Sequence, residues 1–107
     1  MTHPLAGIKV LEIGQAYAGP LAGMILADMG ADVIKVEKPD GGDDARQWGP
    51  PFVGDDSAMF RANNRGKRSV ALDIKDATAL ARLRELATDA DILIQNLRPG
   101  VVDEIGI

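Results

Sequence analysis

The chain has 107 residues, of which 46% are hydrophobic and 26% charged, a composition typical of a single globular domain. It contains no cysteine, which excludes disulfides, a thiol nucleophile and cysteine metal ligands. Its formal net charge of -4 argues against nucleic acid as a partner. No apolar run approaches the ~20 residues of a membrane span, and the N-terminus does not resemble a secretory signal. We therefore expect a cytoplasmic protein with neither nucleic acid nor membrane as a partner.

The first 40 residues predict a strand, a helix and a second strand. An apolar run over 8–13, bounded by glycines, is typical of a buried strand. Pro20 suits the first position of a helix over 20–29, and Gly30 suits its end. A second strand over 31–37 follows at once, so the two strands should be parallel. The predicted apolar face of the helix consists of Leu21, Met24, Ile25 and Met29.

A long connection separates this unit from the rest of the predicted sheet. Residues 38–67 contain five glycines and three prolines, which is typical of a functional or disordered loop, although 57–63 can form a short helix. The aspartates between Asp40 and Asp56 lack the spacing of a calcium loop, so we expect a solvated loop and no metal site. Residues 61–68 hold four basic residues and no acidic one. This cluster suits a small polyanion, or else it is a chance grouping in a solvated loop.

The last third of the chain predicts two further strands around a helix. The strands cover 68–74 and 91–96, and Asp76 can cap a helix over 77–90. The whole order predicts an α/β fold, a Rossmann-like parallel sheet with helices on its faces. Two full helices leave part of a four-stranded sheet uncovered. We therefore expect residues 1–107 to be an incomplete piece of a larger fold.

Ligands of open α/β sheets bind at the carboxyl ends of the strands. The turn from Gly14 to Pro20 lacks both the dinucleotide-binding fingerprint and the P-loop motif. Glu37 stands where an NAD enzyme has its ribose-binding acid, but without the glycines it is weak support for an NAD site. Lys75 and Arg98 suit phosphate, and Asn96 suits a base or a ribose. A solvated lysine and an ordinary polar turn remain the alternatives. All these residues follow strands, so folding should bring them to one edge.

Three segments carry a resemblance to a known family. They are PLAGIKVLEIGQAYAGPLAGMILADMGADVIKVEKPDGGD, NNRGKRSVALDIK and ADILIQNLRPGVVDEIGI, which together cover nearly the whole chain. They resemble the opening of family III CoA-transferases, a group that includes formyl-CoA:oxalate transferase, carnitine CoA-transferase and alpha-methylacyl-CoA racemase. The resemblance implies that coenzyme A, the substrate and acyl carrier, contacts Tyr17, Ala18, Lys38, Leu72, Asp73, Ile74, Lys75, Asn96, Leu97 and Arg98.

Two positions depart from the family pattern. Lys38 stands where some members have arginine, which exchanges a bidentate phosphate contact for a single charge, and Glu104 stands where some use arginine near the nucleotide. The resemblance also implies CoA thioester and carboxylic acid substrates, a homodimer, and an aspartate nucleophile beyond Ile107, so we expect no catalytic residue in this chain. The long GGDDARQWGPP loop favours a transferase. A racemase and a noncatalytic nucleotide-binding module remain the alternatives.

Overall fold

The computed structural model describes residues 3–106. Its elements, in chain order, are β1 (Lys9–Ile13), α1 (Ala18–Asp28), β2 (Asp32–Glu37), the 3-10 helix η1 (Asp44–Gln47), β3 (Phe52–Val53), β4 (Asp56–Ser57), α2 (Ala58–Asn63), β5 (Lys67–Ala71), α3 (Ala77–Asp89), β6 (Ile92–Gln95) and α4 (Val101–Ile105). The four long strands lie within three residues of the predicted boundaries. The Asp76 carboxylate caps α3 as predicted, accepting a hydrogen bond from the Ala79 amide at 2.9 Å.

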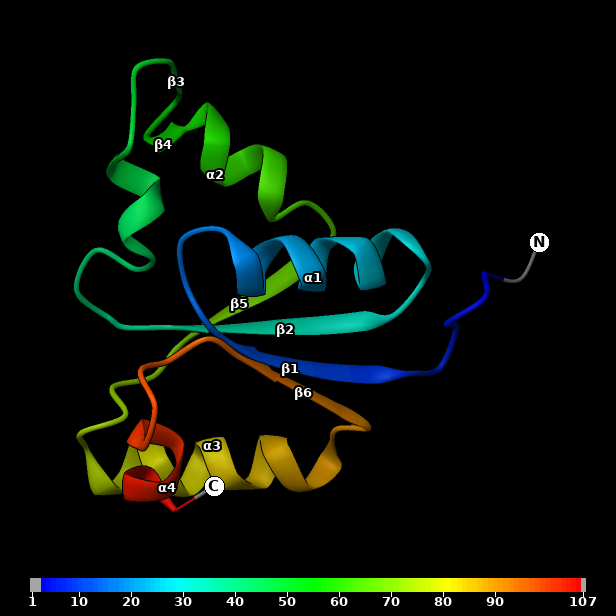
Figure 1. Ribbon diagram of the computed structural model, residues 1–107, viewed down its shortest axis with the longest axis vertical. Coiled ribbons are helices and arrows are strands. Elements are labelled where there is room, and N and C mark those ends of the chain that lie inside the picture. Colours follow the sequence, from blue (N-terminus) through cyan, green and yellow to red (C-terminus); the bar gives the residue numbers. More distant parts are fainter. Residues whose placement is uncertain (1–2, 107) are drawn as a thin grey trace.

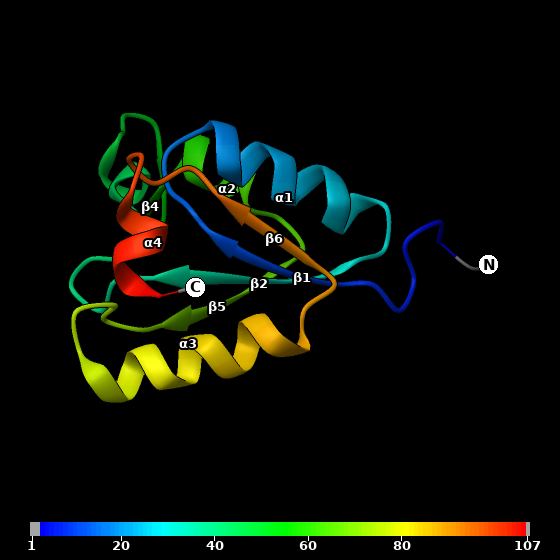
Figure 2. The same ribbon diagram turned by 60° about the horizontal axis from the view of Figure 1, so that its bottom comes forward.

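The four long strands form one sheet in the order β5-β2-β1-β6, and every pair is parallel. Helices α1 and α2 lie over one face of the sheet, and α3 lies over the other (Figure 1). The predicted α/β fold, a Rossmann-like parallel sheet with helices on its faces, is confirmed. Since all four strands run the same way, their carboxyl ends meet at one edge, on the left in Figure 2.

The strands alternate their side chains between two apolar layers. On the α3 side, Leu11, Ile13 and Val36 pack against Leu83 of α3. On the α1 side, the layer consists of Val10, Ala31 and Val33, with Leu26 and Ala27 of α1 packed against it. On the α1 side, the buried apolar residues of β1 and β2 thus lie in the amino-terminal half of these two strands.

The predicted apolar face of α1 is right for Met24, which is buried, and for Leu21 in part, but it is wrong for Ile25 and Met29. The buried residues of this helix are Gly19, Pro20, Gly23 and Met24, whereas Ile25 is 48% exposed and Met29 is 40% exposed. One cause lies below the helix, where the buried carboxylate of Glu12 occupies the sheet surface and leaves room only for glycine at position 23. Helix α1 also begins two residues earlier than predicted, which puts Pro20 at its third position. That position still needs no amide donor, because it belongs to the first turn.

The connection between β2 and β5 is an ordered excursion. It contains η1, the hairpin of β3 and β4, and α2, which packs beside α1 (Figure 1). Ser57 caps α2, since its hydroxyl accepts a hydrogen bond from the Phe60 amide at 3.0 Å. The short helix predicted over 57–63 is thus confirmed. Of the two alternatives for 38–67, a functional or a disordered loop, the ordered elements argue against the disordered one.

Part of the sheet surface is uncovered in the described residues, as expected. β6 is an edge strand, and its Ile92 and Leu93 are 37% and 41% exposed. The small helix α4 covers one end of α3, where the Arg84 guanidinium donates to the Ile105 carbonyl oxygen at 3.0 Å. Within residues 3–106, no helix combines the length and the apolar character needed to cross a membrane.

Candidate ligand-binding site

A cavity of about 400 Å³ opens at the carboxyl ends of the four strands. Its apolar wall comes from the ends of β1 and β2 and from the segments that follow β5 and β6, and consists of Ile13, Val36, Leu72, Ile74 and Leu97. Two lysines, Lys38 and Lys75, line it together with four carboxylates, those of Glu37, Asp40, Asp43 and Asp73. The cavity therefore offers an apolar surface beside two ammonium groups, which suits a ligand with both an apolar part and anionic groups.

The structure brings together six of the ten residues predicted to contact a ligand. Those that line the cavity are Lys38, Leu72, Asp73, Ile74, Lys75 and Leu97. The other four, Tyr17, Ala18, Asn96 and Arg98, lie outside the lining. Tyr17 is 55% exposed and precedes the first residue of α1, so its ring faces solvent beside the turn. Contact with a ligand stays a prediction for all ten.

Asn96 is bonded to the first turn of the chain. Its side-chain oxygen accepts from the Gln15 amide at 3.1 Å, and its side-chain nitrogen donates to the Gln15 carbonyl at 2.9 Å. The amide side chain thus extends the pairing of β1 and β6 by one step. Gly14 and Gly19 allow this approach, since a Cβ at these positions would lie 2.5 Å and 3.2 Å from the Asn96 side-chain oxygen. Asn96 therefore holds the turn in place, a role that we did not predict.

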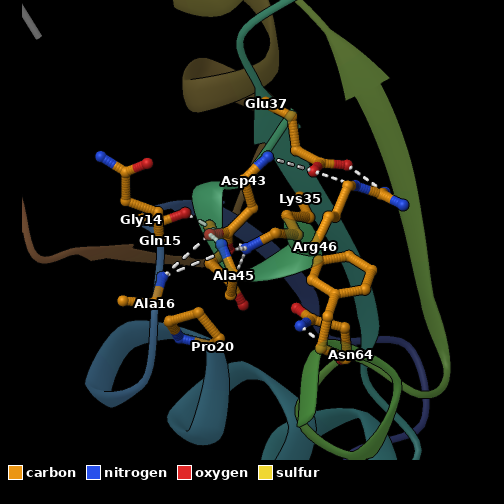
Figure 3. Close-up of polar contacts among 12 residues, drawn as sticks. Gly14, Gln15, Ala16, Pro20, Lys35, Glu37, Asp43, Ala45, Arg46 and Asn64 are labelled. Atoms are coloured by element: carbon orange, nitrogen blue, oxygen red, sulfur yellow. Dashed lines mark hydrogen bonds and ion pairs between the residues drawn. The ribbon is translucent and has the colours of Figure 1, made fainter. Parts of the chain in front are cut away.

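The same turn already receives an anion from within the protein. The Ala16 amide donates to both carboxylate oxygens of Asp43, at 3.1 and 3.3 Å (Figure 3). Ala16 adopts a φ of 72°, a conformation uncommon outside glycine, and these bonds help to hold it. Because the Ala16 amide already donates to the Asp43 carboxylate, it is not free to donate a hydrogen bond to a phosphate. The finding agrees with the absence of a dinucleotide fingerprint after β1.

Two lysines and two carboxylates form a charged cluster between the sheet and α1. Glu12 on β1 and Lys35 on β2 are register partners, and the Lys35 ammonium lies 2.9 Å from a Glu12 carboxylate oxygen and 3.0 Å from Asp43. Lys67, at the start of β5, lies 2.7 Å from the other oxygen of Glu12. All four side chains are at most 2% exposed. Their charges cancel, as burial of ions requires.

The remaining donors of the two ammonium groups bond to backbone and amide oxygens. Lys35 donates to the Gly14 carbonyl at 3.2 Å, which places a further bond on the first turn. Lys67 donates to the Pro20 carbonyl and to the Asn64 side-chain oxygen, both at 2.8 Å. Burial lowers the pKa of Lys67, and the adjacent Glu12 carboxylate opposes this effect. The cluster thus joins β1, β2, β5, the start of α1 and the end of α2.

Glu37, the last residue of β2, attaches the connection between β2 and β5 to the sheet. Its carboxylate accepts two bonds from the Arg46 guanidinium at 2.7 and 2.8 Å and one from the Asp43 amide at 2.8 Å (Figure 3). It also accepts a bond from the Ser69 hydroxyl. Burial by itself raises the pKa of Glu37, but these hydrogen bonds outweigh burial and lower it to about 2. Arg46 also pairs with Asp56 at 2.9 Å. With its oxygens engaged by the protein, Glu37 does not act as a ribose-binding acid in this structure.

The basic cluster over 61–68 does not form an open anion site. Arg65 pairs with Asp28, Arg68 pairs with Asp32, both at 2.7 Å, and Lys67 is buried against Glu12. Carboxylates of the chain therefore neutralise three of its four basic residues. The picture of a wholly solvated acidic loop needs the same correction, because Asp43 is 2% exposed and Asp56 is paired with Arg46.

The residues that organise the site were missed because each looks ordinary in its own segment. Glu12 and Lys35 lie in predicted strands that are mostly apolar but contain other charged residues as well. Their positions carried a usable signal, since each is a charged residue at the fifth position of a predicted strand, 8–13 or 31–37. In parallel strands aligned at their ends, such residues become neighbours across the sheet. Asp43 carried no comparable signal, because it lies among four other aspartates.

Comparison with known proteins gives a consistent result. The family model for CoA-transferase family III matches residues 5–107. The chain is 49% identical to succinate–glutarate CoA-transferase of Agrobacterium fabrum and 46% identical to succinyl-CoA:glutarate CoA-transferase of Homo sapiens. In both cases the match covers 97% of this chain, and it covers 28% and 24% of those relatives. A crystal structure of a CAIB/BAIF family protein from Brucella suis superposes with a TM-score of 0.94 at 45% identity, over 100% of this chain and 29% of that one. The chain thus spans about a quarter of the length of these relatives.

Proposed function

Because the chain belongs to CoA-transferase family III, we propose that it forms the CoA-binding part of an enzyme that transfers CoA between carboxylic acids. The observation that carries this proposal is the cavity at the carboxyl ends of the four strands, where Lys38 and Lys75 stand beside an apolar wall. CoA combines phosphate groups with an adenine ring and an apolar arm. The lysines suit its phosphates, and the apolar wall suits its ring or its arm.

We propose that an aspartate downstream of Ile107 attacks the acyl-CoA thioester, so that acyl and CoA pass through covalent intermediates. The present residues then hold CoA while the aspartate is acylated. The expectation follows that the 107-residue chain alone has no transferase activity.

The relatives suggest the class of acid. Two of those with the highest identity are named for succinate or succinyl-CoA and glutarate, both dicarboxylic acids. We propose dicarboxylates as donor and acceptor, and a cytoplasmic homodimer as the acting form. The direct test is an assay of the full-length protein with succinyl-CoA as donor and glutarate as acceptor, with butyrate as a monocarboxylate control. Formation of glutaryl-CoA supports the proposal, and its absence with every dicarboxylate contradicts it.

Two alternatives predict different results in the same preparation. A racemase exchanges the α-proton of an α-methylacyl-CoA in heavy water without an acceptor acid, whereas a transferase does not. A noncatalytic nucleotide-binding module binds CoA or another nucleotide and turns over neither substrate. A full-length protein that binds a nucleotide but shows neither CoA transfer nor α-proton exchange is the module, and calorimetric titration with CoA and with NAD tests whether the site binds CoA and not NAD.

A further inference from the structure

One of the two cavity lysines already has an anionic partner. The Lys38 ammonium lies 2.6 Å from a carboxylate oxygen of Asp44, and the two side chains are 52% and 57% exposed. The hydrogen bond to Asp44, reinforced by the charge of that carboxylate, raises the pKa of Lys38. The ion pair stands at the mouth of the cavity, because Lys38 is one of the lining residues.

Asp44 is held in this position by the structure around it. It is the first residue of η1, a turn capped by Asp43, whose side chain accepts from the Ala45 amide at 3.0 Å. The other end of η1 carries Arg46, which is fixed by Glu37 and Asp56. Asp44 is thus attached to a fixed segment, and a ligand that reaches Lys38 meets this carboxylate.

The second lysine differs in this respect. Within residues 3–106, no carboxylate lies within ion-pair distance of the Lys75 ammonium. An anionic group can therefore bind Lys75 without exchanging partners. At Lys38 the same group must displace Asp44 or share the ammonium with it, and sharing brings two negative charges close together.

We propose that Asp44 sets the affinity of this site for phosphate-bearing ligands by competing for Lys38. The proposal rests on the proposed function, that is, on CoA binding in this cavity. In the free protein, Asp44 neutralises Lys38. In the complex, a phosphate of CoA takes its place at the ammonium, and Asp44 turns to solvent. The competition lowers CoA affinity, which favours release of CoA-bearing products.

The test is calorimetric titration of CoA into the full-length protein carrying Asp44→Asn. We expect the variant to bind CoA at least about threefold more tightly, because the competing charge is removed while a side chain of the same size remains. The matched control is Asp89→Asn. Asp89 makes a similarly exposed ion pair with Lys9 at 3.2 Å, but at the amino ends of the strands. The Asp89→Asn substitution changes the net charge by the same amount as Asp44→Asn and should leave the affinity for CoA within about twofold of wild type.

A second variant tests whether Asp44 acts through Lys38. In a protein that also carries Lys38→Met, the gain from Asp44→Asn should shrink, since there is no ammonium to compete for. Equal gains with and without Lys38, equal effects of the Asp44 and Asp89 substitutions, or weaker binding by Asp44→Asn would each overturn the competition while leaving CoA binding intact. Absence of CoA binding to wild type and all variants would overturn the proposed function, and the competition with it.

Discussion

Lys75 allows the most direct test of the cavity at the scale of a single residue. Its ammonium lines the cavity, and its side chain takes no part in the ion pairs of the described residues. We expect Lys75→Ala in the full-length protein to weaken CoA binding by about 1.5–3 kcal/mol, the usual loss for a charged hydrogen bond. Calorimetric titration measures this change.

The fold should be unaffected by this substitution, because Lys75 is exposed and lies in the loop before α3. Lys9→Ala is the matched control, since it removes an exposed lysine from the opposite end of the sheet. An affinity for CoA that is equal in the two variants and in wild type would mean that Lys75 is simply a solvated residue.

Glu37 predicts a specific dependence of stability on pH. The pKa of this carboxyl is about 2 in the folded protein and 4.5 when unperturbed. Because the folded value is the lower one, the group stabilises the fold fully above about pH 4.5 and loses this contribution as the pH falls toward 2. The loss amounts to about 3 kcal/mol.

Urea denaturation at several pH values measures this contribution. Glu37→Gln should be less stable than wild type at neutral pH, and the difference should narrow below pH 4.5. The exposed Glu85, which pairs only with Arg82 at 3.1 Å, provides the control substitution Glu85→Gln. A constant difference between wild type and Glu37→Gln from pH 7 to pH 2.5 would contradict the assigned pKa.

At the scale of elements, the contact between α1 and β1 depends on one missing side chain. A Cβ at Gly23 would lie 1.9 Å from a carboxylate oxygen of Glu12. Alanine in a helix is ordinarily favourable by about 1 kcal/mol over glycine. Here we expect Gly23→Ala to be destabilising by about 2–4 kcal/mol, since the helix must move away or Glu12 must leave Lys35 and Lys67.

Thermal and urea denaturation measure the effect of Gly23→Ala. Ala22→Ser adds one heavy atom at the neighbouring position, which is exposed, and should change stability by less than about 0.5 kcal/mol. A Gly23→Ala protein as stable as wild type would show that α1 does not depend on this close approach.

The same contact explains what the sequence could predict about α1. Helix length and the glycine at its end follow from local spacing and conformational preference, and both were predicted correctly to within about two residues. The buried face depends on what lies beneath it. Periodicity selects the large apolar residues Ile25 and Met29, but the carboxylate of Glu12 beneath the helix requires glycine at position 23. A rule that considers one segment at a time cannot include this constraint.

The excursion between β2 and β5 shows the same limit more strongly. Its composition of glycine, proline and aspartate is that of a flexible loop. Its order comes from pairs between distant residues, in which Glu37 binds Arg46 and Ser69, and Arg46 binds Asp56. The position of the cavity was predictable, because parallel topology alone gathers the strand ends. The role of Asn96 was not, because its partner Gln15 lies 81 residues away.

At the scale of the whole molecule, the uncovered edge of the sheet predicts how the isolated 107-residue chain behaves. β6 has a strand on one side only, and Ile92 and Leu93 are more than one-third exposed. Open strand edges and exposed apolar side chains promote association. We expect sedimentation of the isolated chain to show association that increases with concentration.

A charge placed on the edge should oppose this association. Leu93→Lys should shift the isolated chain toward the monomer, whereas Thr78→Lys, which adds the same charge on the exposed side of α3, should have little effect. The two proteins can be compared at matched concentrations. A wild-type chain that remains monomeric up to about 1 mM would contradict the role assigned to the edge.

The position of β1 between β2 and β6 also sets an order of events during synthesis. β2 leaves the ribosome soon after β1, so these strands and α1 can pair early. The other side of β1 waits for β6, and its turn waits for Asn96, which follows Gln15 by 81 residues. At 5–20 residues per second, this interval is about 4–16 s. During this interval one edge of β1 has no partner strand. Although β1 lies inside the folded sheet, it is therefore the strand that most needs protection from association while the chain is made.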